Sequence, residues 1–188
     1  MHTVHIVLVE ADSEAEAYEK VARKLESQPE WSDWHNANGT PPFAGRWTNG
    51  VFLTEAQMKE INERSADDPE VEFSDVPNIL CYADDPELAE YTLARFASDV
   101  KQEMRECMPA ILDVNSLIDE YSSYSQDSVH ASMEVWQLKR VLQLLSGEWT
   151  PDSRFYDLET YCSSLFYFSE RCGKEPHKQY LVPVDFHF

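Results

Sequence analysis

Residues 31–47 hold five side chains that could take part in binding chemistry. They are Trp31, Trp34, His35, Arg46 and Trp47. Large aromatic side chains dominate interface energetics, and an arginine next to a tryptophan can stack on a base or bind an anion. The same side chains can instead fix a long loop onto neighbouring helices, with the arginine paired to an acid. Segment 29–53 lacks hydrophobic periodicity, so we predict an ordered, aromatic-rich loop there that is a candidate binding site.

Histidines near both ends of the chain suggest a second arrangement. If the first and last strands pair, His5, Asp185 and His187 would share one face of the sheet. Two imidazoles and a carboxylate can hold a metal ion or move a proton. The alternative is two edge histidines without a functional role, because the register of the pairing is unknown.

The cysteines suggest no metal centre. Cys162, Cys172 and His177 could in principle bind zinc, but the spacing of the two cysteines matches no compact ligand pattern. Buried structural thiols are the expected alternative. Together with Cys81 and Cys107 they include no CxxC pair, which favours reduced thiols and a cytoplasmic protein. We predict no metal and no cofactor.

Familiar catalytic motifs do not occur in this sequence. No serine lies in a G-x-S-x-G context, and no glycine-rich loop follows the first predicted strand. The carboxylates are so numerous that choosing any two as acid and base would be arbitrary. The sequence leaves enzymatic activity uncertain and leans against it.

The charge of the chain is strongly one-sided. It has 35 acidic and 15 basic residues, for a formal net charge of −20. Such a surface repels nucleic acid and anionic membranes, because both are bound through Lys and Arg. It attracts basic surfaces and accelerates encounter with them. The composition therefore argues against direct nucleic-acid and membrane binding and favours a protein partner with a basic surface.

Part of the acidity follows the aromatic-rich loop directly. The row consists of Glu55, Glu60, Glu63, Asp67, Asp68, Glu70 and Glu72. Acids in the first turn of a helix interact well with its dipole, which explains some of them. Adaptation to high salt is a second explanation for the whole surface, and it would spread the acids evenly. A basic partner is the third, and it would gather the acids on one face.

Local patterns predict where the helices and strands lie. Residues 3–9 and 180–188 are apolar strands at the two ends, and Pro183 indicates that the last strand is an edge or pairs there on one side only. Capping signals at Ser13, Thr54 and Asp85 begin helices near residues 13, 54 and 86. Apolar spacing predicts further helices over 129–145 and 158–172, and Gly147 is expected to stop the first of these. A helix at 111–121, one after Thr150, and short strands at 71–73 and 79–82 are also expected. The chain should form one α+β domain over residues 1–188: a small, mainly antiparallel sheet including both terminal strands, packed by four to six helices.

The stretch PPFAGRWTNGVF adds a resemblance. Its Gly45, Arg46, Trp47 and Gly50 follow an opening strand and helix, as in small acidic virus-encoded (phage) proteins with a Gly-Arg-Trp loop. The resemblance covers about the first 55 residues. It carries no activity across, but it implies a viral origin and, with it, location in the cytoplasm of a host cell.

These observations rank three functions. The first is a non-enzymatic inhibitor that mimics nucleic acid and occupies a basic, nucleic-acid-binding surface of a host protein. Its field would come from the acidic row after residue 54, and its anchors from Trp31, Trp34, Arg46 and Trp47. The second is a small-ligand-binding protein or enzyme with a pocket under the Trp-rich loop, where His35 would face the ligand. The third is an assembly subunit of a virus particle or complex; the sequence does not fix the oligomeric state.

Overall fold

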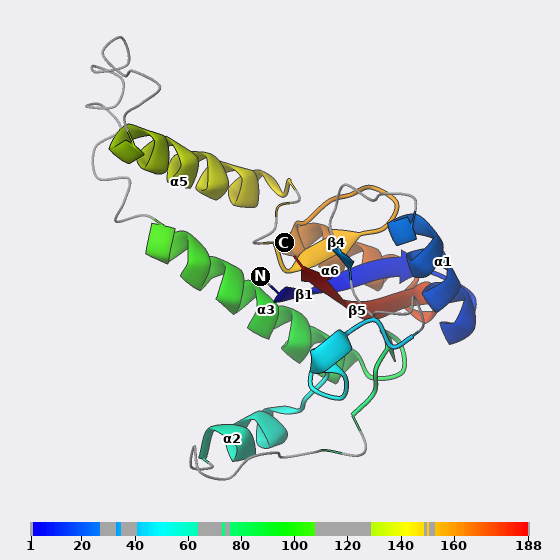
Figure 1. Ribbon diagram of the computed structural model, residues 1–188. Coiled ribbons are helices and arrows are strands. Elements are labelled where there is room, and N and C mark those ends of the chain that lie inside the picture. Colours follow the sequence, from blue (N-terminus) through cyan, green and yellow to red (C-terminus); the bar gives the residue numbers. More distant parts are fainter. Residues whose placement is uncertain are drawn as a thin grey trace.

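The first and last strands of the chain lie side by side at the centre of a five-stranded mixed sheet (Figure 1). The structure is a computed structural model, and it describes residues 2–26, 33–34, 41–63, 73, 76–107, 129–148, 150 and 153–187. Strand β1 (His2–Glu10) pairs antiparallel with β5 (Gln179–His187) along their whole length. The prediction that both terminal strands belong to one sheet is confirmed, as is the α+β class.

Three short strands complete the sheet. Strand β4 (Phe155–Asp157) runs parallel to β1 on its free side, while β2 (Asp33–Trp34) and β3 (Leu80–Cys81) both pair antiparallel with the far side of β5. The order along the main path is therefore β2-β5-β1-β4. Three of the four pairings are antiparallel, as the mainly antiparallel prediction requires.

Pro183 lies in the middle of β5, where one side of the strand has no ladder partner among the described residues. It is opposite Ile6 of β1, while β3 ends its pairing at Leu181 and β2 begins at Phe186. The amide of Ile6 points the other way and donates to the carbonyl of Arg154 at 2.8 Å. Proline supplies no N–H, and in this gap no ladder bond needs one. The strand is central rather than an edge, and the expectation of pairing on one side only holds at this residue.

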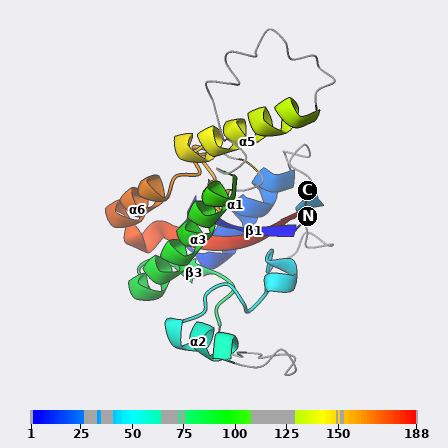
Figure 2. The ribbon, with the colours of Figure 1, turned by 90° about the vertical axis from the view of Figure 1, so that its left-hand side faces the viewer.

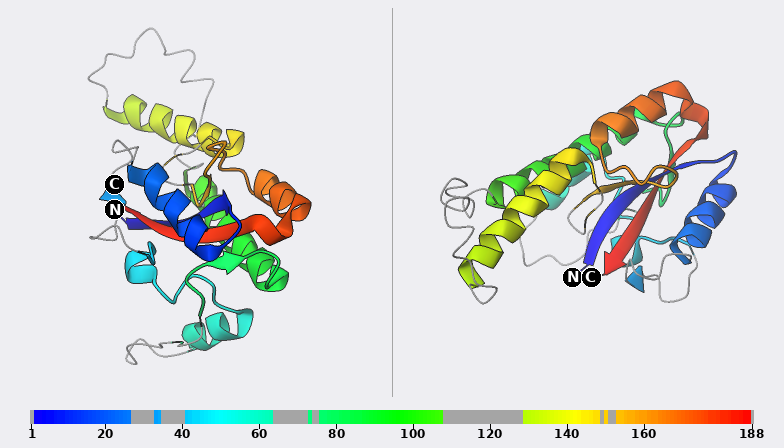
Figure 3. Two further views of the ribbon diagram at one scale, coloured as in Figure 1. Left: turned by 90° about the vertical axis from the view of Figure 1, so that its right-hand side faces the viewer. Right: turned by 90° about the horizontal axis from the view of Figure 1, so that it is seen from above.

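Helices cover both faces of the sheet (Figure 3). One face packs against α1 (Glu14–Glu26) through Ala17, Val21 and Leu25. The other face packs against α3 (Pro86–Cys107) and α6 (Leu165–Lys174), which contribute a larger apolar cluster. Burial of apolar surface on both faces is the main force that holds these layers together.

The predicted helix starts are confirmed by their caps. Ser13 Oγ accepts from the amide of Glu16 at 3.3 Å, and the Glu16 carboxylate accepts from the Asp12 amide at 2.8 Å. At α2 (Glu55–Glu63), Thr54 and Gln57 form the reciprocal pattern of a capping box. These short-range bonds explain why local sequence was sufficient to locate both helix starts.

Helix α5 (Val129–Ser146) packs along α3, and the two helices are joined by an ion pair between Arg140 and Glu103 at 2.5 Å. Gly147 follows with φ of 74°, the left-handed conformation that ends a helix and favours glycine. The predicted helix and its glycine stop are therefore confirmed.

The helix predicted over 158–172 is wrong in its first half. A helix was expected over 158–172, but α6 begins only at Leu165, and the preceding strand β4 was not predicted. The cause is Asp157, whose Oδ1 accepts from the amides of Glu159 and Thr160 at 3.1 and 2.7 Å and so closes a turn. The expected helix at 111–121 and most of the strand at 71–73 lie outside the described residues. Residues 151 and 152 also lie outside them, but the short helix expected after Thr150 is not found in the described residues 153–157, which lead into and form strand β4.

The predicted grouping of His5, Asp185 and His187 on one sheet face is also wrong. In the observed register His5 is opposite Val184, while Asp185 is opposite Val4. Side chains alternate between faces along a strand, so His5 lies on the α1 side and Asp185 on the other. His5 is fully buried, with its ring 4.8 Å from that of Phe186.

Candidate functional site

Two segments of the described surface carry more acidic than basic residues. Segments 55–63 and 84–95 together carry seven acids and two bases. The acids, all exposed, are Glu55, Glu60, Glu63, Asp84, Asp85, Glu87 and Glu90. By contrast, segments 14–26 and 165–178, which contain α1 and α6, together carry six acids and six bases. Charge is therefore uneven across the described part of the chain.

A hollow of about 450 Å³ joins the two acidic segments. It lies between the N-terminus of α2 and that of α3, and Figure 2 shows α2 next to the start of α3, away from the sheet. Its walls and floor are formed by Thr54, Glu55, Ala56, Asp85, Glu87, Leu88 and Tyr91. We call this the acidic hollow.

The acids of the hollow have a local structural reason to be there. Asp85 caps α3, its Oδ1 accepting from the amide of Leu88 at 2.9 Å, and Pro86 occupies the first helical position. Glu55 and Glu87 lie in the first turns of their helices, where the dipole favours negative charge. Each helix N-terminus offsets about half an elementary charge, so three carboxylates leave the hollow negative by roughly two charges.

The hollow combines two properties that suit a lysine or arginine side chain. Leu88 and Tyr91 are half-buried and provide apolar and aromatic surface, while the exposed carboxylates stand around it. The long stems of Lys and Arg pack on apolar surface while their charged ends stay near solvent. The ring of Tyr91 could also attract a cation placed over its face.

The structure brings only some of the predicted site residues together. Glu55 lines the hollow, and Glu60 and Glu63 are exposed on the same helix. Trp47 ends a short 3-10 helix (Gly45–Trp47) and is 37% exposed. The other predicted site residues lie outside what the structure describes. They are Trp31, Asp67, Asp68, Glu70, Glu72 and the side chains of Trp34 and Arg46.

Sequence reasoning missed Asp85 and Glu87 as site residues. Asp85 was recognised as a helix cap, and that role is confirmed. The signal that could have found the site is the occurrence of two capped helix starts, each carrying acids in its first turn. Their proximity is a property of the tertiary fold, since they are about thirty residues apart in the chain.

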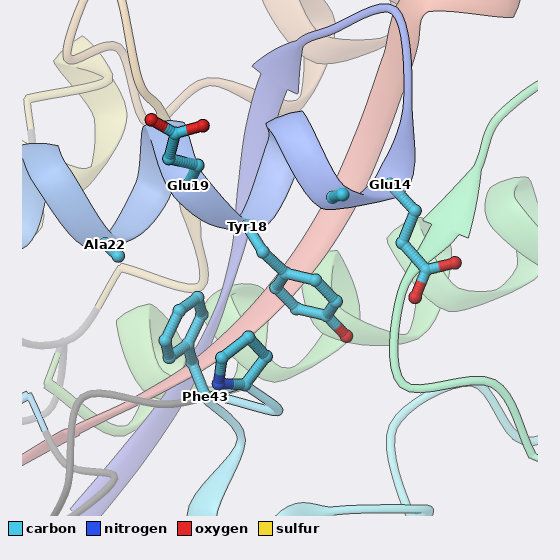
Figure 4. A pocket seen from close by; sticks show the side chains of 7 residues that line it. Glu14, Tyr18, Glu19, Ala22 and Phe43 are labelled. Atoms are coloured by element: carbon cyan, nitrogen blue, oxygen red, sulfur yellow. The ribbon is translucent and has the colours of Figure 1, made fainter.

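A second hollow, of about 610 Å³, lies between α1 and the segment that follows Pro41. Figure 4 shows Tyr18 directed toward Phe43, and their rings meet edge to face at 5.5 Å. Burial, and then the nearby Glu14, raise the pKa of Tyr18 to about 12. The hollow lies under part of the predicted aromatic-rich loop, but Trp47 is not among the described residues that line it.

The cysteine set does not form a metal centre in the part of the chain that the structure describes, where no three His, Cys, Asp or Glu side chains are placed to hold an ion. Cys172 is fully buried in the apolar cluster of α6, and burial raises the pKa of its thiol to about 12. No described helix is both long and apolar enough to span a membrane.

Comparison with known proteins adds no relative. No family model, no curated protein sequence and no solved structure matches the chain. Functional inference therefore depends on the residues and their geometry.

Proposed function

We propose that the chain is a non-enzymatic binding protein whose acidic surface occupies a basic surface of a protein partner. The observation that supports this most is the acidic hollow, where Glu55, Asp85 and Glu87 surround Leu88 and Tyr91. High-salt adaptation predicts an even spread of acids, whereas the described surface carries a local excess at α2 and the start of α3. An anionic surface of this kind steers a cationic partner toward it.

The partner class follows from the chemistry of the hollow. A lysine or arginine of the partner would place its stem on Leu88 and Tyr91 and its charge among the carboxylates. Rows of exposed Lys and Arg are typical of nucleic-acid-binding surfaces. We therefore propose a partner with such a surface, with this protein acting as a decoy for nucleic acid. A viral origin and a host target remain predictions from the Gly-Arg-Trp resemblance.

The test uses charge-neutralising substitutions that preserve the helix caps. The site variant is Glu55→Gln, Asp85→Asn and Glu87→Gln combined, since Asn caps a helix as well as Asp. The control variant is Glu14→Gln, Glu19→Gln and Glu26→Gln on α1, which changes the net charge equally. The probe is a fluorescent amphipathic Lys/Leu peptide whose binding is followed by anisotropy.

We expect the site variant to bind the peptide about 5- to 30-fold more weakly than wild type, because three partly exposed ion pairs contribute roughly 1–2 kcal/mol together. The control variant should lose less than half of that free energy. Raising salt from about 50 to about 500 mM should weaken wild-type binding strongly. Equal losses in the two variants, or binding that ignores salt, would reject the proposed site.

A small-ligand-binding function is a second candidate, supported by the mainly apolar hollow beside Tyr18 and Phe43. A ligand that binds only the folded protein raises its melting temperature. Ala22→Leu would fill this hollow from α1, so a fragment that stabilises wild type through this hollow should not stabilise the variant. Identical thermal shifts in both proteins would remove this candidate.

A further inference from the structure

The carboxyl end of β1 borders a third hollow, of about 420 Å³, on the sheet face covered by α6. Its lining includes Glu10, Tyr167, Arg171, Lys174, Glu175 and Gln179. We propose that this hollow is a binding site for a small molecule that carries a primary amine, and we call it the Gln179 hollow. The site is separate from the acidic hollow and does not depend on the proposed function.

The sheet register places two of its side chains next to each other. Glu10 and Gln179 are directly opposite in the β1–β5 ladder, so they project from the same face. Leu8 and Leu181, two positions earlier and later, belong to the apolar cluster that packs against α6. Because side chains on one face repeat every second residue, Glu10 and Gln179 continue this row toward solvent at the end of the sheet.

Arg171 of α6 fixes one wall of the hollow. Its guanidinium binds the Asp157 carboxylate at 2.9 Å, the Glu10 carboxylate at 3.1 Å and the Glu159 carboxylate at 3.2 Å. Its side chain is only 14% exposed. A charged group held by three partners and largely buried has little freedom to move, so the wall is preorganised.

Gln179 supplies the observation that points to a ligand. The residue is 2% exposed, and its Oε1 is buried without a hydrogen-bond partner among the described residues. A buried amide oxygen without a donor costs free energy, and native structures contain few of them. The terminal torsion of glutamine is broad, so the amide can turn its oxygen toward the hollow that Gln179 lines. The group that this oxygen lacks is an N–H or O–H donor.

The charge of the hollow indicates which kind of N–H or O–H donor would bind there. Lys174 is paired with Glu170 at 2.6 Å, and Arg171 is surrounded by three carboxylates. Glu175 forms no ion pair with any residue that the structure describes, and it is an exposed residue of the lining. The excess charge is negative, which favours a cation. A primary ammonium group is both a cation and an N–H donor.

The test compares three probes that share a four-carbon chain by isothermal titration: n-butylamine, butyltrimethylammonium and butyrate. Butylamine should bind about tenfold more tightly than butyltrimethylammonium, which has the same charge but no N–H to donate to Gln179. Butyrate should not bind detectably. Equal affinity for the two cations would overturn the proposal, because it would leave only non-specific attraction to an acidic protein.

Variants then locate the site. Gln179→Met should reduce butylamine binding about tenfold, to the level of the quaternary probe, and should leave binding of the quaternary probe unchanged. Its melting temperature should not fall, because the substitution removes an oxygen that lacks a partner. Glu175→Gln should weaken both cations about threefold, while Glu26→Gln on the opposite face of the sheet should not. Unchanged butylamine binding in Gln179→Met, or equal losses in Glu175→Gln and Glu26→Gln, would refute the assignment. If Gln179→Met does not fold, the Glu175 and Glu26 comparison decides alone.

Discussion

Replacing Arg171 by methionine should be among the most destabilising single changes in the described chain. The Asp157 carboxylate is 0% exposed, and its Oδ2 accepts from the Arg171 guanidinium at 2.9 Å. Burial tends to lower the pKa of Arg171, but Asp157, Glu159 and Tyr167 all raise it, and the net shift of the pKa is upward. The guanidinium is therefore charged at every practical pH, and Arg171→Met leaves a buried carboxylate without its cation.

Breaking a buried pair in this way costs about 3–5 kcal/mol, because the remaining charge is desolvated without compensation. We take about 3 kcal/mol here, since Asp157 Oδ1 keeps its bonds to two backbone amides and to the Thr160 hydroxyl. For a chain of this size the melting temperature should fall by roughly 6–12 °C. Urea unfolding followed by circular dichroism measures the loss.

Two further variants make this test specific. Arg23→Met removes an exposed pair with Glu19, whose side chains are 66% and 69% exposed, and should cost at most about 0.5 kcal/mol. The double variant Asp157→Asn with Arg171→Met leaves no buried charge and should recover at least about 1 kcal/mol of the loss. If Arg171→Met costs no more than Arg23→Met, or the double variant is no more stable than Arg171→Met, the reasoning about the buried charge is refuted.

Three other predictions concern single residues. Cys172 should resist iodoacetamide at about pH 9, because burial raises its pKa to about 12, while the half-buried Cys162 reacts; mass spectrometry that finds both modified equally would contradict this. The hydrogen bond that Tyr82 donates to Glu90, followed by burial, raises the pKa of Tyr82 to about 12 from 10.0. The stability that this hydrogen bond contributes is therefore complete below pH 10 and lost as pH rises through about 12. Tyr82→Phe should flatten the fall in unfolding free energy between these two pH values, and a slope equal to that of wild type would exclude this contribution. Gly147→Ala should destabilise by about 1–2 kcal/mol in urea unfolding, because φ is 74° there; a neutral effect would show that the backbone can relax.

The sequence predicted features whose causes are local. Ser13, Thr54 and Asp85 mark helix starts because each cap side chain accepts from an amide three residues further along the chain. Gly147 announces a helix end because its left-handed conformation disfavours other residues. The apolar runs at both ends of the chain predicted strands. Because an apolar strand is stable only next to another buried strand, the sequence also predicted that both belong to one sheet.

Features that depend on register or tertiary contact were not predictable in this way. In the observed β1–β5 register, His5 and Asp185 lie on opposite faces of the sheet, and a register shifted by one residue would put them on the same face. Neither strand alone determines which of the two registers forms. Strand β4 has only three residues, and its turn is made by the side chain of Asp157 rather than by Gly or Pro. The acidic hollow required α2 and α3 to be brought together, so Glu55 was named as a site residue without Asp85 or Glu87.

The most direct test of the proposed binding function is to map the contact surface residue by residue. Backbone amide NMR spectra would be recorded while the Lys/Leu peptide is added to the isotopically labelled protein. The largest shift changes should occur at Glu55, Ala56, Glu87, Leu88 and Tyr91, and α1 (Glu14–Glu26) should be nearly unaffected. Changes spread evenly over both regions, or none at the acidic hollow, would contradict the claim that this surface exists to bind a basic partner.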